Sequence, residues 1–175
     1  YVVEPKIDGV AVSLTYRKGI LETAVTRGNG VEGDIIIQNL LHLQDLPREI
    51  VSTDIPEFIE IRGEIYMEHK EFLRINKDRT RLNLPLYANP RNLAAGTVKL
   101  LDPKEAKQRQ LKIVLYGLGA CEPSSFFNSQ IAFHEALKTW QFPTVEFVKF
   151  VRSADLAWDR ICQLDKLRHG YAYPT

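Results

Sequence analysis

Alternating apolar and polar side chains predict antiparallel strands in the first third of the chain. Residues 10–17 place Val, Val, Leu and Tyr at even positions, with Ala, Ser, Thr and Arg between them. This period of two is typical of a half-buried strand. Lys18 and Gly19 separate it from a second β-prone run at 20–27, so we expect a β-hairpin. Residues 57–67 predict a further strand, which carries on its polar face Glu60, Arg62 and Glu64.

Helical periodicity, capping residues and prolines predict the remaining elements. The expected helices cover residues 68–79, 92–101, 129–140 and 153–170, and the expected strands cover residues 111–119 and 144–151. Ser153 is the predicted N-cap of the last helix. The apolar run at 35–43 fits either a helix or a strand. This order of elements favours an α+β fold with antiparallel sheet over a regular βαβ repeat.

Composition and charge restrict the class of protein. The chain has 175 residues, of which 45% are hydrophobic and 26% charged, so we expect one soluble globular domain. Its 23 basic and 22 acidic residues leave a net charge of +1, so a nucleic acid would have to meet a local patch, such as the basic stretch 91–112. Cys121 and Cys162 are too few for a four-cysteine zinc site. No signal peptide or membrane-length apolar run occurs, and we expect a cytoplasmic protein with no membrane partner.

One glycine pattern suggests a dinucleotide site but lies in the wrong place. Gly28, Gly30 and Gly33 satisfy the spacing G-x-G-x-x-G. That fingerprint joins the first strand of a βαβ unit to a long helix, whereas here it follows the second arm of the expected hairpin. We interpret it as a glycine-rich turn.

The segment Glu4-Pro5-Lys6-Ile7-Asp8-Gly9 is the stronger candidate for chemistry. In an extended segment, positions 4, 6 and 8 share one face, which places a lysine between two carboxylates. A solvated strand with ordinary ion pairs would have the same pattern. A nucleophilic lysine must be neutral, which at pH 7 costs roughly 4–5 kcal/mol for an ordinary lysine. Because Glu4 and Asp8 oppose deprotonation, an active Lys6 needs positive charge or Mg²⁺ from elsewhere.

Six blocks along the chain together resemble the nucleotidyltransferase core of bacterial NAD-dependent DNA ligases. The K-x-D-G of the first block is common to covalent nucleotidyltransferases, and NPRN-x-AAG is specific to the NAD-dependent branch. The blocks are EPKIDG at 4–9, TRGNGVEGD at 26–34, EIRGEIYM at 60–67, ANPRNLAAGTVKLLDP at 88–103, LYGLG at 115–119 and HEALKTWQFP at 134–143.

The resemblance implies a fold, a reaction and a set of site residues. The fold would be an ATP-grasp-like α+β core in residues 1–175. Lys6 would take AMP from NAD, AMP would pass to the 5′-phosphate at a DNA nick, and the 3′-hydroxyl would displace it. The implied substrates and partners are NAD, Mg²⁺ and nicked duplex DNA, with a monomeric protein and unassigned metal ligands. The implied roles are Lys6 as nucleophile, Glu4 at the adenine edge, Arg27 and Glu64 at the ribose, Tyr116 stacked on adenine, and Arg91 and Lys99 near phosphates or DNA.

Each of these residues also has an ordinary structural interpretation. Arg27 fits a solvated hairpin position, and Glu64 fits a surface ion pair. Tyr116 lies in an apolar strand, as a core tyrosine would. His134 occupies a helical position at which we expect a surface side chain. The part of the basic stretch from Lys99 to Lys112 could follow a DNA backbone or form a solvated helix face.

The chain departs from the family pattern at four internal positions and at its ends. Asn29 stands where the family's R-G-D-G has a carboxylate, and Asp34-Ile35 replaces its usual E-D. Lys99 stands where arginine is frequent, which keeps the charge but loses bidentate geometry. The family's preceding nicotinamide mononucleotide subdomain and its following D-G-x-V-x-K motif are not in these residues. We therefore expect an incomplete core that by itself neither adenylylates efficiently nor seals nicks. An ATP-dependent ligase or capping-type enzyme, or a non-catalytic nucleotide- or DNA-binding fragment, remain alternatives.

Overall fold

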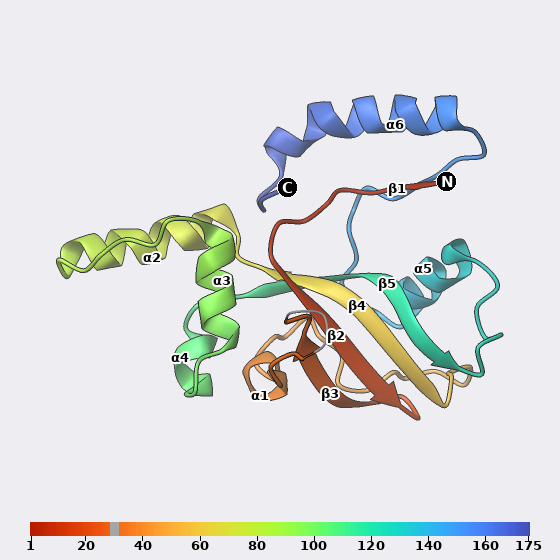
Figure 1. The fold of residues 1–175 in the computed structure, drawn as a ribbon, viewed down its shortest axis with the longest axis horizontal. Helices are drawn as coiled ribbons and strands as arrows, with labels where there is room; N and C mark the ends of the chain where they lie inside the picture. The colour runs from red at the N-terminus through yellow and green to blue at the C-terminus, as the bar shows by residue number, and fades with distance from the viewer. Residues whose placement is uncertain (29–31) are drawn as a thin grey trace.

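A four-stranded antiparallel sheet forms the centre of the molecule (Figure 1). The computed structural model describes residues 1–28 and 32–175. The strand order is β3-β2-β4-β5. The strands are β2 (Val10–Arg17), β3 (Ile20–Thr26), β4 (Phe58–Tyr66) and β5 (Lys112–Glu122). The predicted hairpin is confirmed, because Arg17 pairs with Ile20 and Val12 with Thr26. The third and fourth predicted strands are confirmed within a few residues.

The helices lie close to the predicted positions. They are α1 (Ile37–Leu40), α2 (His69–Arg81), α3 (Pro90–Val98), α4 (Pro103–Lys107), α5 (Gln130–Thr139) and α6 (Ala154–Leu167), the last followed by a 3₁₀ turn at Arg168–Gly170. The side chains of Ser129 and Ser153 cap α5 and α6 by accepting backbone N–H groups. Helix α3 begins two residues earlier than predicted because Asn89 caps it and Pro90 fits its first position. The run at 35–43, open from its sequence, contains the four-residue α1.

The predicted strand at 144–151 is largely wrong. Only β6 (Lys149–Phe150) forms there, and it pairs with β1 (Val2–Val3) in a separate two-stranded sheet. The apolar alternation has a different cause: Val145 is buried in one small cluster with Ile7, and Phe147 in another with Val3. Because the two clusters account for these apolar side chains, the alternation does not require a ladder of strand hydrogen bonds.

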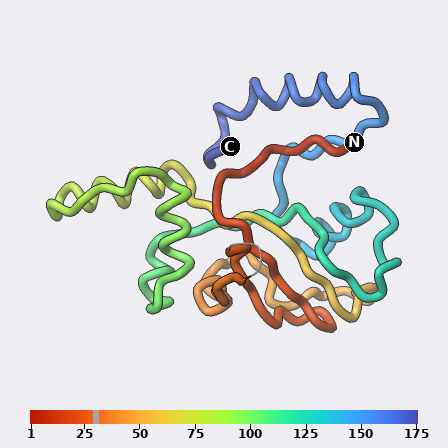
Figure 2. The backbone as a smooth tube through the Cα atoms, viewed as in Figure 1, coloured from red at the N-terminus to blue at the C-terminus, as the bar shows by residue number. Residues whose placement is uncertain are grey.

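One face of the large sheet is apolar and supports the core. Leu14, Ile61 and Leu115 are fully buried there, together with helical residues such as Leu93 and Phe133. The opposite face carries the polar side chains of β4, as predicted from its alternation. The antiparallel α+β class is thereby confirmed. In Figure 2 the N-terminal segment, β6 and α6 lie side by side, and Val3, Phe147 and Ala157 form their shared cluster. No helix of the described residues is long and apolar enough to cross a membrane.

The glycine pattern at 28–33 does not open a dinucleotide-binding unit. It follows β3, and the next helix, α1, has only four residues. Gly28 has φ +53, a conformation that favours glycine, and Thr26 N–H donates to the carbonyl of Asp34 at 3.0 Å as the chain returns. Asn29 and Gly30, which include the departure from R-G-D-G, lie outside the described residues.

Candidate active site

The segment that carries Lys6 links β1 to β2, and its side chains alternate in burial. Pro5 and Ile7 are buried, whereas Glu4 and Asp8 are partly exposed and Lys6 is exposed. The predicted shared face of positions 4, 6 and 8 is therefore present, although the segment pairs with no strand. Lys6 forms no hydrogen bond or ion pair with the described residues. Its amine is thus accessible for reaction.

The two carboxylates beside Lys6 contact other side chains. Asp8 Oδ1 pairs with Arg91 Nη1 at 2.9 Å, and Glu4 Oε2 lies 3.8 Å from His134 Nε2. The fold therefore brings a side chain from a distant element next to each carboxylate, which the linear spacing does not show. The positive charge of Lys6 acts to lower the pKa of Glu64.

Four of the predicted site residues line one cavity. This cavity has a volume of about 260 Å³, and its lining is Glu4, Pro5, Lys6, Ile7, Glu64 and Tyr116. Glu64 and Tyr116 meet because β4 and β5 are antiparallel neighbours, with Glu64 opposite Val114, two residues before Tyr116 on the same face. The Tyr116 hydroxyl donates to Glu64 Oε2 at 3.2 Å. The site therefore combines a lysine amine, two carboxyl groups and an aromatic ring.

Burial shifts the pKa values of the acidic groups at this cavity. Burial raises the pKa of Glu64, opposed by the Tyr116 hydroxyl, the Gly9 backbone and the charges of Lys6 and Arg91. Burial also raises the pKa of Glu4. The pKa of Tyr116 is raised to about 12 by burial and by the neighbouring carboxylates. At neutral pH the phenol is consequently a hydrogen-bond donor and an uncharged stacking surface.

Arg27 lies beside this cavity rather than in it. It follows β3 and lines an adjoining cavity of about 650 Å³, with Tyr116 contributing to the walls of both. The positive charge of Arg27 acts to lower the pKa of Tyr116, which shows that the two side chains are neighbours. The adjoining cavity also exposes Glu60 and Arg62, which are paired at 3.1 Å. A ligand longer than one ring system can therefore extend from Tyr116 towards Arg27.

The two residues expected near phosphates or DNA lie at opposite ends of α3. Arg91 is in the first turn and reaches the Lys6 segment through Asp8. Lys99 is the C-terminal cap, about 12 Å away along the helix axis, and pairs with Asp34 at 2.7 Å. Only Arg91 is thus brought to the cavity that contains Lys6.

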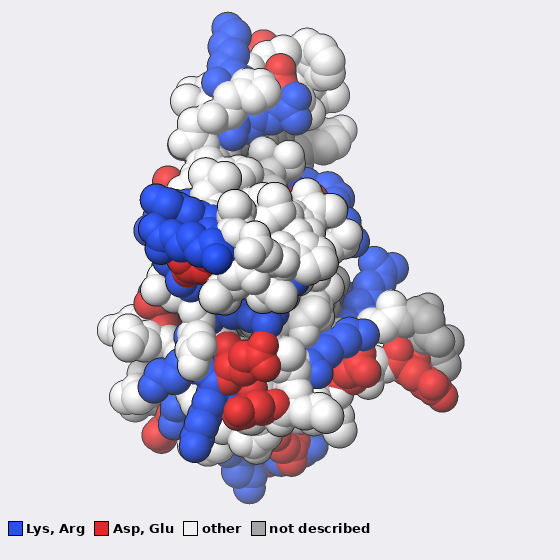
Figure 3. All heavy atoms as spheres, turned by 90° about the vertical axis from the view of Figure 1, so that its left-hand side faces the viewer, with Lys and Arg blue, Asp and Glu red and all other residues white. Residues whose placement is uncertain are grey.

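The basic stretch 91–112 is largely neutralised by carboxylates. Arg91, Lys99, Arg109 and Lys112 pair with Asp8, Asp34, Glu105 and Asp45, respectively. Figure 3 shows basic and acidic side chains interspersed over the side that it displays. An interaction with a polyanion would therefore have to displace internal partners or use the unpaired lysines between them.

The sequence of the chain matches one known family. The family model for the NAD-dependent DNA ligase adenylation domain matches residues 1–175. The chain belongs to this family. A protein named DNA ligase 1 from Opitutus terrae is 53% identical over 179 residues, which cover 100% of this chain and 26% of that protein. The DNA ligase of Thermodesulfovibrio yellowstonii is 44% identical, again over 100% of this chain and 26% of its own length. The chain thus spans about a quarter of the length of these curated relatives.

The adenylation domain contains two residues behind the cavity lining that sequence reasoning missed. His134, expected on the surface, is only 2% exposed and lies behind Glu4. Gln130, one helical turn earlier on α5, contacts both His134 and the backbone of Tyr116. The spacing of four residues could have indicated a shared helix face, but the partners come from β5 and the N-terminal segment.

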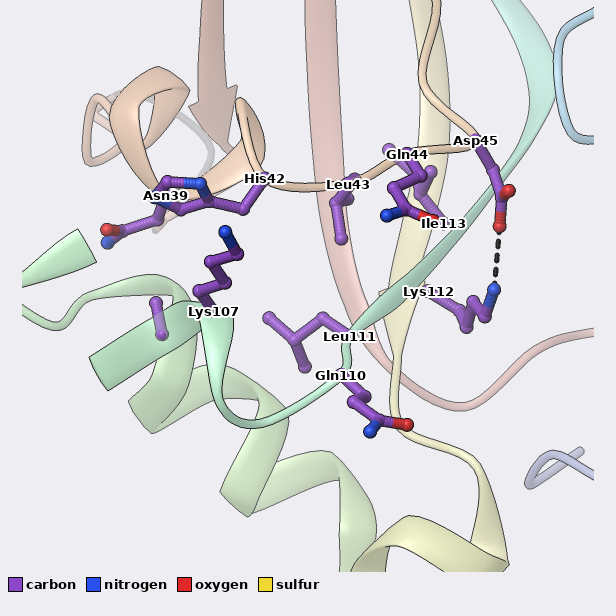
Figure 4. Close-up of a pocket in the computed structure, with 11 residues that line it drawn as sticks. Asn39, His42, Leu43, Gln44, Asp45, Lys107, Gln110, Leu111, Lys112 and Ile113 are labelled. Carbon is purple, nitrogen blue, oxygen red and sulfur yellow. Dashed lines mark hydrogen bonds and ion pairs between the residues drawn. The ribbon is translucent and has the colours of Figure 1, made fainter. Parts of the chain in front are cut away.

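A second cavity of the domain is separate from this site. It has a volume of about 310 Å³ and lies between the α1 region and the α4–β5 connection (Figure 4). In Figure 4, Lys107 extends towards His42 at one end, and Lys112 pairs with Asp45 at the other, at 2.7 Å. None of the predicted site residues lines it. The cavity lined by Lys6 is therefore the better candidate for the active site, although it is smaller than this second cavity.

Proposed function

We propose that this adenylation domain forms a covalent Lys6–AMP intermediate from NAD. The observation that carries the proposal is the convergence of an unpaired lysine, Glu4, Glu64 and Tyr116 on one cavity. The Lys6 nitrogen attacks the adenylyl phosphorus, and the bond from that phosphorus to the oxygen of nicotinamide mononucleotide breaks. The amine loses a proton, and nicotinamide mononucleotide leaves with the bonding electron pair. The product is a phosphoramidate at Lys6.

The chemistry of the cavity suits each part of an adenylate. The neutral Tyr116 ring provides a platform for the base, and the Glu4 carboxyl supplies an acceptor for an amino group at the adenine edge. Glu64 and Arg27 can bind ribose hydroxyls, because a carboxylate accepts and a guanidinium donates. Arg91, in the first turn of α3, supplies positive charge on the side of Lys6 and Asp8. Lys99 is a weaker candidate for phosphate contact because it lies at the far end of that helix.

The proposal includes Mg²⁺, bound chiefly by the substrate. The described residues contain no group of three or more His, Cys, Asp or Glu side chains that could hold a metal ion. Mg²⁺ is often held by one or two carboxylates together with substrate phosphates. The ion would supply neutralisation of phosphate charge.

The longer protein implied by the family would complete a ligase cycle. We propose an ATP-grasp-like nucleotidyltransferase core in residues 1–175, in a monomeric, cytoplasmic DNA ligase that acts in replication and repair. AMP would be passed to a 5′-phosphate at a nick in duplex DNA, and the 3′-hydroxyl would then displace it. The names of the relatives, DNA ligase 1 and DNA ligase, support the assignment as a DNA ligase.

Mass spectrometry tests the covalent step directly. A full-length ligase that contains this domain is incubated with NAD and Mg²⁺, its intact mass is measured, and the labelled peptide is mapped. We expect one AMP per labelled chain, on Lys6, and no label in Lys6→Arg. The matched control is Lys18→Arg, an exposed lysine in the β2–β3 turn that pairs with Glu57. Label on another lysine would refute Lys6 as nucleophile, and label from ATP but not NAD would favour an ATP-dependent nucleotidyltransferase. Absence of both AMP binding and label would contradict the proposal as a whole.

A further inference from the structure

Helix α5 contacts both of the side chains proposed to hold adenine. Gln130 Nε2 lies 3.0 Å from the carbonyl oxygen of Tyr116 and 3.1 Å from His134 Nε2. His134 Nε2 in turn lies 3.8 Å from Glu4 Oε2. Because Gln130 and His134 are four residues apart, they share one face of α5. A short chain of polar contacts thus runs from Tyr116 to Glu4.

The geometry assigns the proton on the His134 ring. A carbonyl oxygen can only accept, so the atom of Gln130 that faces Tyr116 must be its amide NH₂ group. The same NH₂ group faces His134 Nε2, which must therefore accept a hydrogen bond. The imidazole is consequently neutral, with its proton on Nδ1. Burial lowers the pKa of His134, which agrees with a neutral ring.

Glu4 and His134 each have one buried polar atom without a hydrogen bond. Among the described residues, neither Glu4 Oε2 nor His134 Nδ1 has a hydrogen-bond partner. At 3.8 Å the contact between Glu4 Oε2 and His134 Nε2 is too long for a hydrogen bond. Leaving buried polar groups unpaired is costly, so such groups call for an explanation beyond packing. Edge contacts with the rings of Phe133 and Phe150 hold the imidazole in this position.

We propose that Gln130 and His134 form a brace that positions Glu4 and Tyr116 relative to each other and thereby selects adenine over 6-oxopurines. Adenine carries an amino donor at position 6, whereas hypoxanthine carries an oxygen acceptor there. A carboxyl oxygen held in place accepts from the first and repels the second. His134 lies behind the Glu4 carboxyl and limits its rotation. Gln130 connects His134 to the backbone of Tyr116, the stacking residue. The inference rests on the proposed function, since it takes the cavity to be an adenylate site.

Competitive binding of AMP and inosine monophosphate tests this brace. Dissociation constants of both nucleotides are measured by calorimetry for the chain and its variants. We expect the wild type to prefer AMP by about tenfold or more, and His134→Leu to lose most of that preference. His134→Gln should retain it, because its amide oxygen reaches the position of Nε2 and still accepts from Gln130. Gln130→Met should resemble His134→Leu, and the double variant should show no additional loss, because both act through one chain of contacts.

A destabilising substitution elsewhere in α5 distinguishes a loss of Glu4 and Tyr116 positioning from a general loss of stability. Leu137→Ala truncates another fully buried residue of α5 and should lower the melting temperature without changing the AMP preference. An unchanged preference in His134→Leu and Gln130→Met, or an equal loss in Leu137→Ala, would refute the brace and leave Lys6 adenylylation intact. If the wild type binds neither nucleotide, the proposed function fails and the brace fails with it.

Discussion

Arg91 and Asp8 are joined by an ion pair of 2.9 Å between the first turn of α3 and the segment that carries Lys6. The pair gives the carboxylate of Asp8 a partner other than Lys6, which lies two residues away on the same face. It also ties the NPRN block to the K-x-D-G block, which are 83 residues apart at this contact. The two motifs of the family therefore meet at the candidate nucleophile.

Loss of this ion pair should impair adenylylation more than stability. Both side chains are about half exposed, so we expect Arg91→Met to change the free energy of unfolding by no more than about 1 kcal/mol. The rate of Lys6 labelling should fall at least about tenfold, because the freed Asp8 carboxylate favours the protonated amine. Quantitative mass spectrometry over time gives the rate. Arg17→Met, which breaks the pair with Glu22 in the hairpin, is the control.

The double variant Arg91→Met/Asp8→Asn distinguishes two origins of that effect. Partial recovery of the rate would show that the freed carboxylate is responsible. A rate as low as that of Arg91→Met would show that the guanidinium itself acts on the phosphates. A wild-type rate in Arg91→Met would contradict any role of this pair in the reaction.

Replacement of Tyr116 should separate stacking from hydrogen bonding. Stacking of a base on an aromatic side chain contributes about 1–3 kcal/mol in nucleic-acid sites, so Tyr116→Ala should weaken AMP binding by about one to two decades. Tyr116→Phe keeps the ring and removes only the donor to Glu64 Oε2, so its loss should be smaller. Calorimetric titration with AMP provides both constants. Equal losses in the two variants would show that the hydroxyl, rather than the ring, matters.

Glu4 should make the stability of the protein depend on pH. Burial raises its pKa in the folded state above the ordinary value of 4.5, so the folded state binds the proton more tightly than the unfolded state. The stabilising contribution is complete below the ordinary pKa and is lost as the pH rises through the folded-state pKa. Glu4→Gln should therefore melt at a higher temperature than wild type at pH 7.5, and the gain should shrink towards pH 4.

Thermal melts across this pH range, followed by circular dichroism, give the comparison. The exposed Glu135→Gln on α5 serves as the control for removal of a surface carboxylate. His134 acts in the opposite direction, because its lowered pKa reduces stability as the pH falls below about 6.5. His134 is present in both the wild type and Glu4→Gln, so it affects the melting curves of both proteins. A Glu4→Gln protein that is less stable than wild type at pH 7.5 would contradict the burial argument.

Two glycines should respond to alanine in opposite directions. A Cβ at Gly9 would overlap the carbonyl oxygen of Ile65, so Gly9→Ala should displace the start of β2 and lower stability by about 1–3 kcal/mol. Gly96 is exposed in α3, and a methyl group added there would meet no atom within 4 Å, so Gly96→Ala should raise stability by about 0.5–1 kcal/mol. Urea denaturation measures both changes. Similar effects of the two substitutions would show that the close approach at Gly9 is not restrictive.

The sequence by itself determined the features that depend on local periodicity and capping. The alternation at 10–17 and in β4 predicted both the strands and the buried face, because successive side chains of a strand point to opposite sides. Ser153 predicted the start of α6, because a cap hydrogen bond spans only three residues. The extended K-x-D-G segment likewise predicted that Glu4, Lys6 and Asp8 point away from the buried positions. The family motifs added the identities of the site residues, which local patterns alone left ambiguous.

Only the tertiary structure decided which of these side chains meet. The alternation at 144–151 did not form the predicted long strand, because Val145 and Phe147 are buried in separate clusters formed by distant segments. The Asp8–Arg91 pair and the burial of His134 behind Glu4 have the same origin, since each joins residues that are far apart in the sequence. Sequence spacing specifies neighbours within one helix or strand. Which faces of those elements come together depends on how the whole chain buries its apolar surface, and this burial decided the surroundings of Lys6.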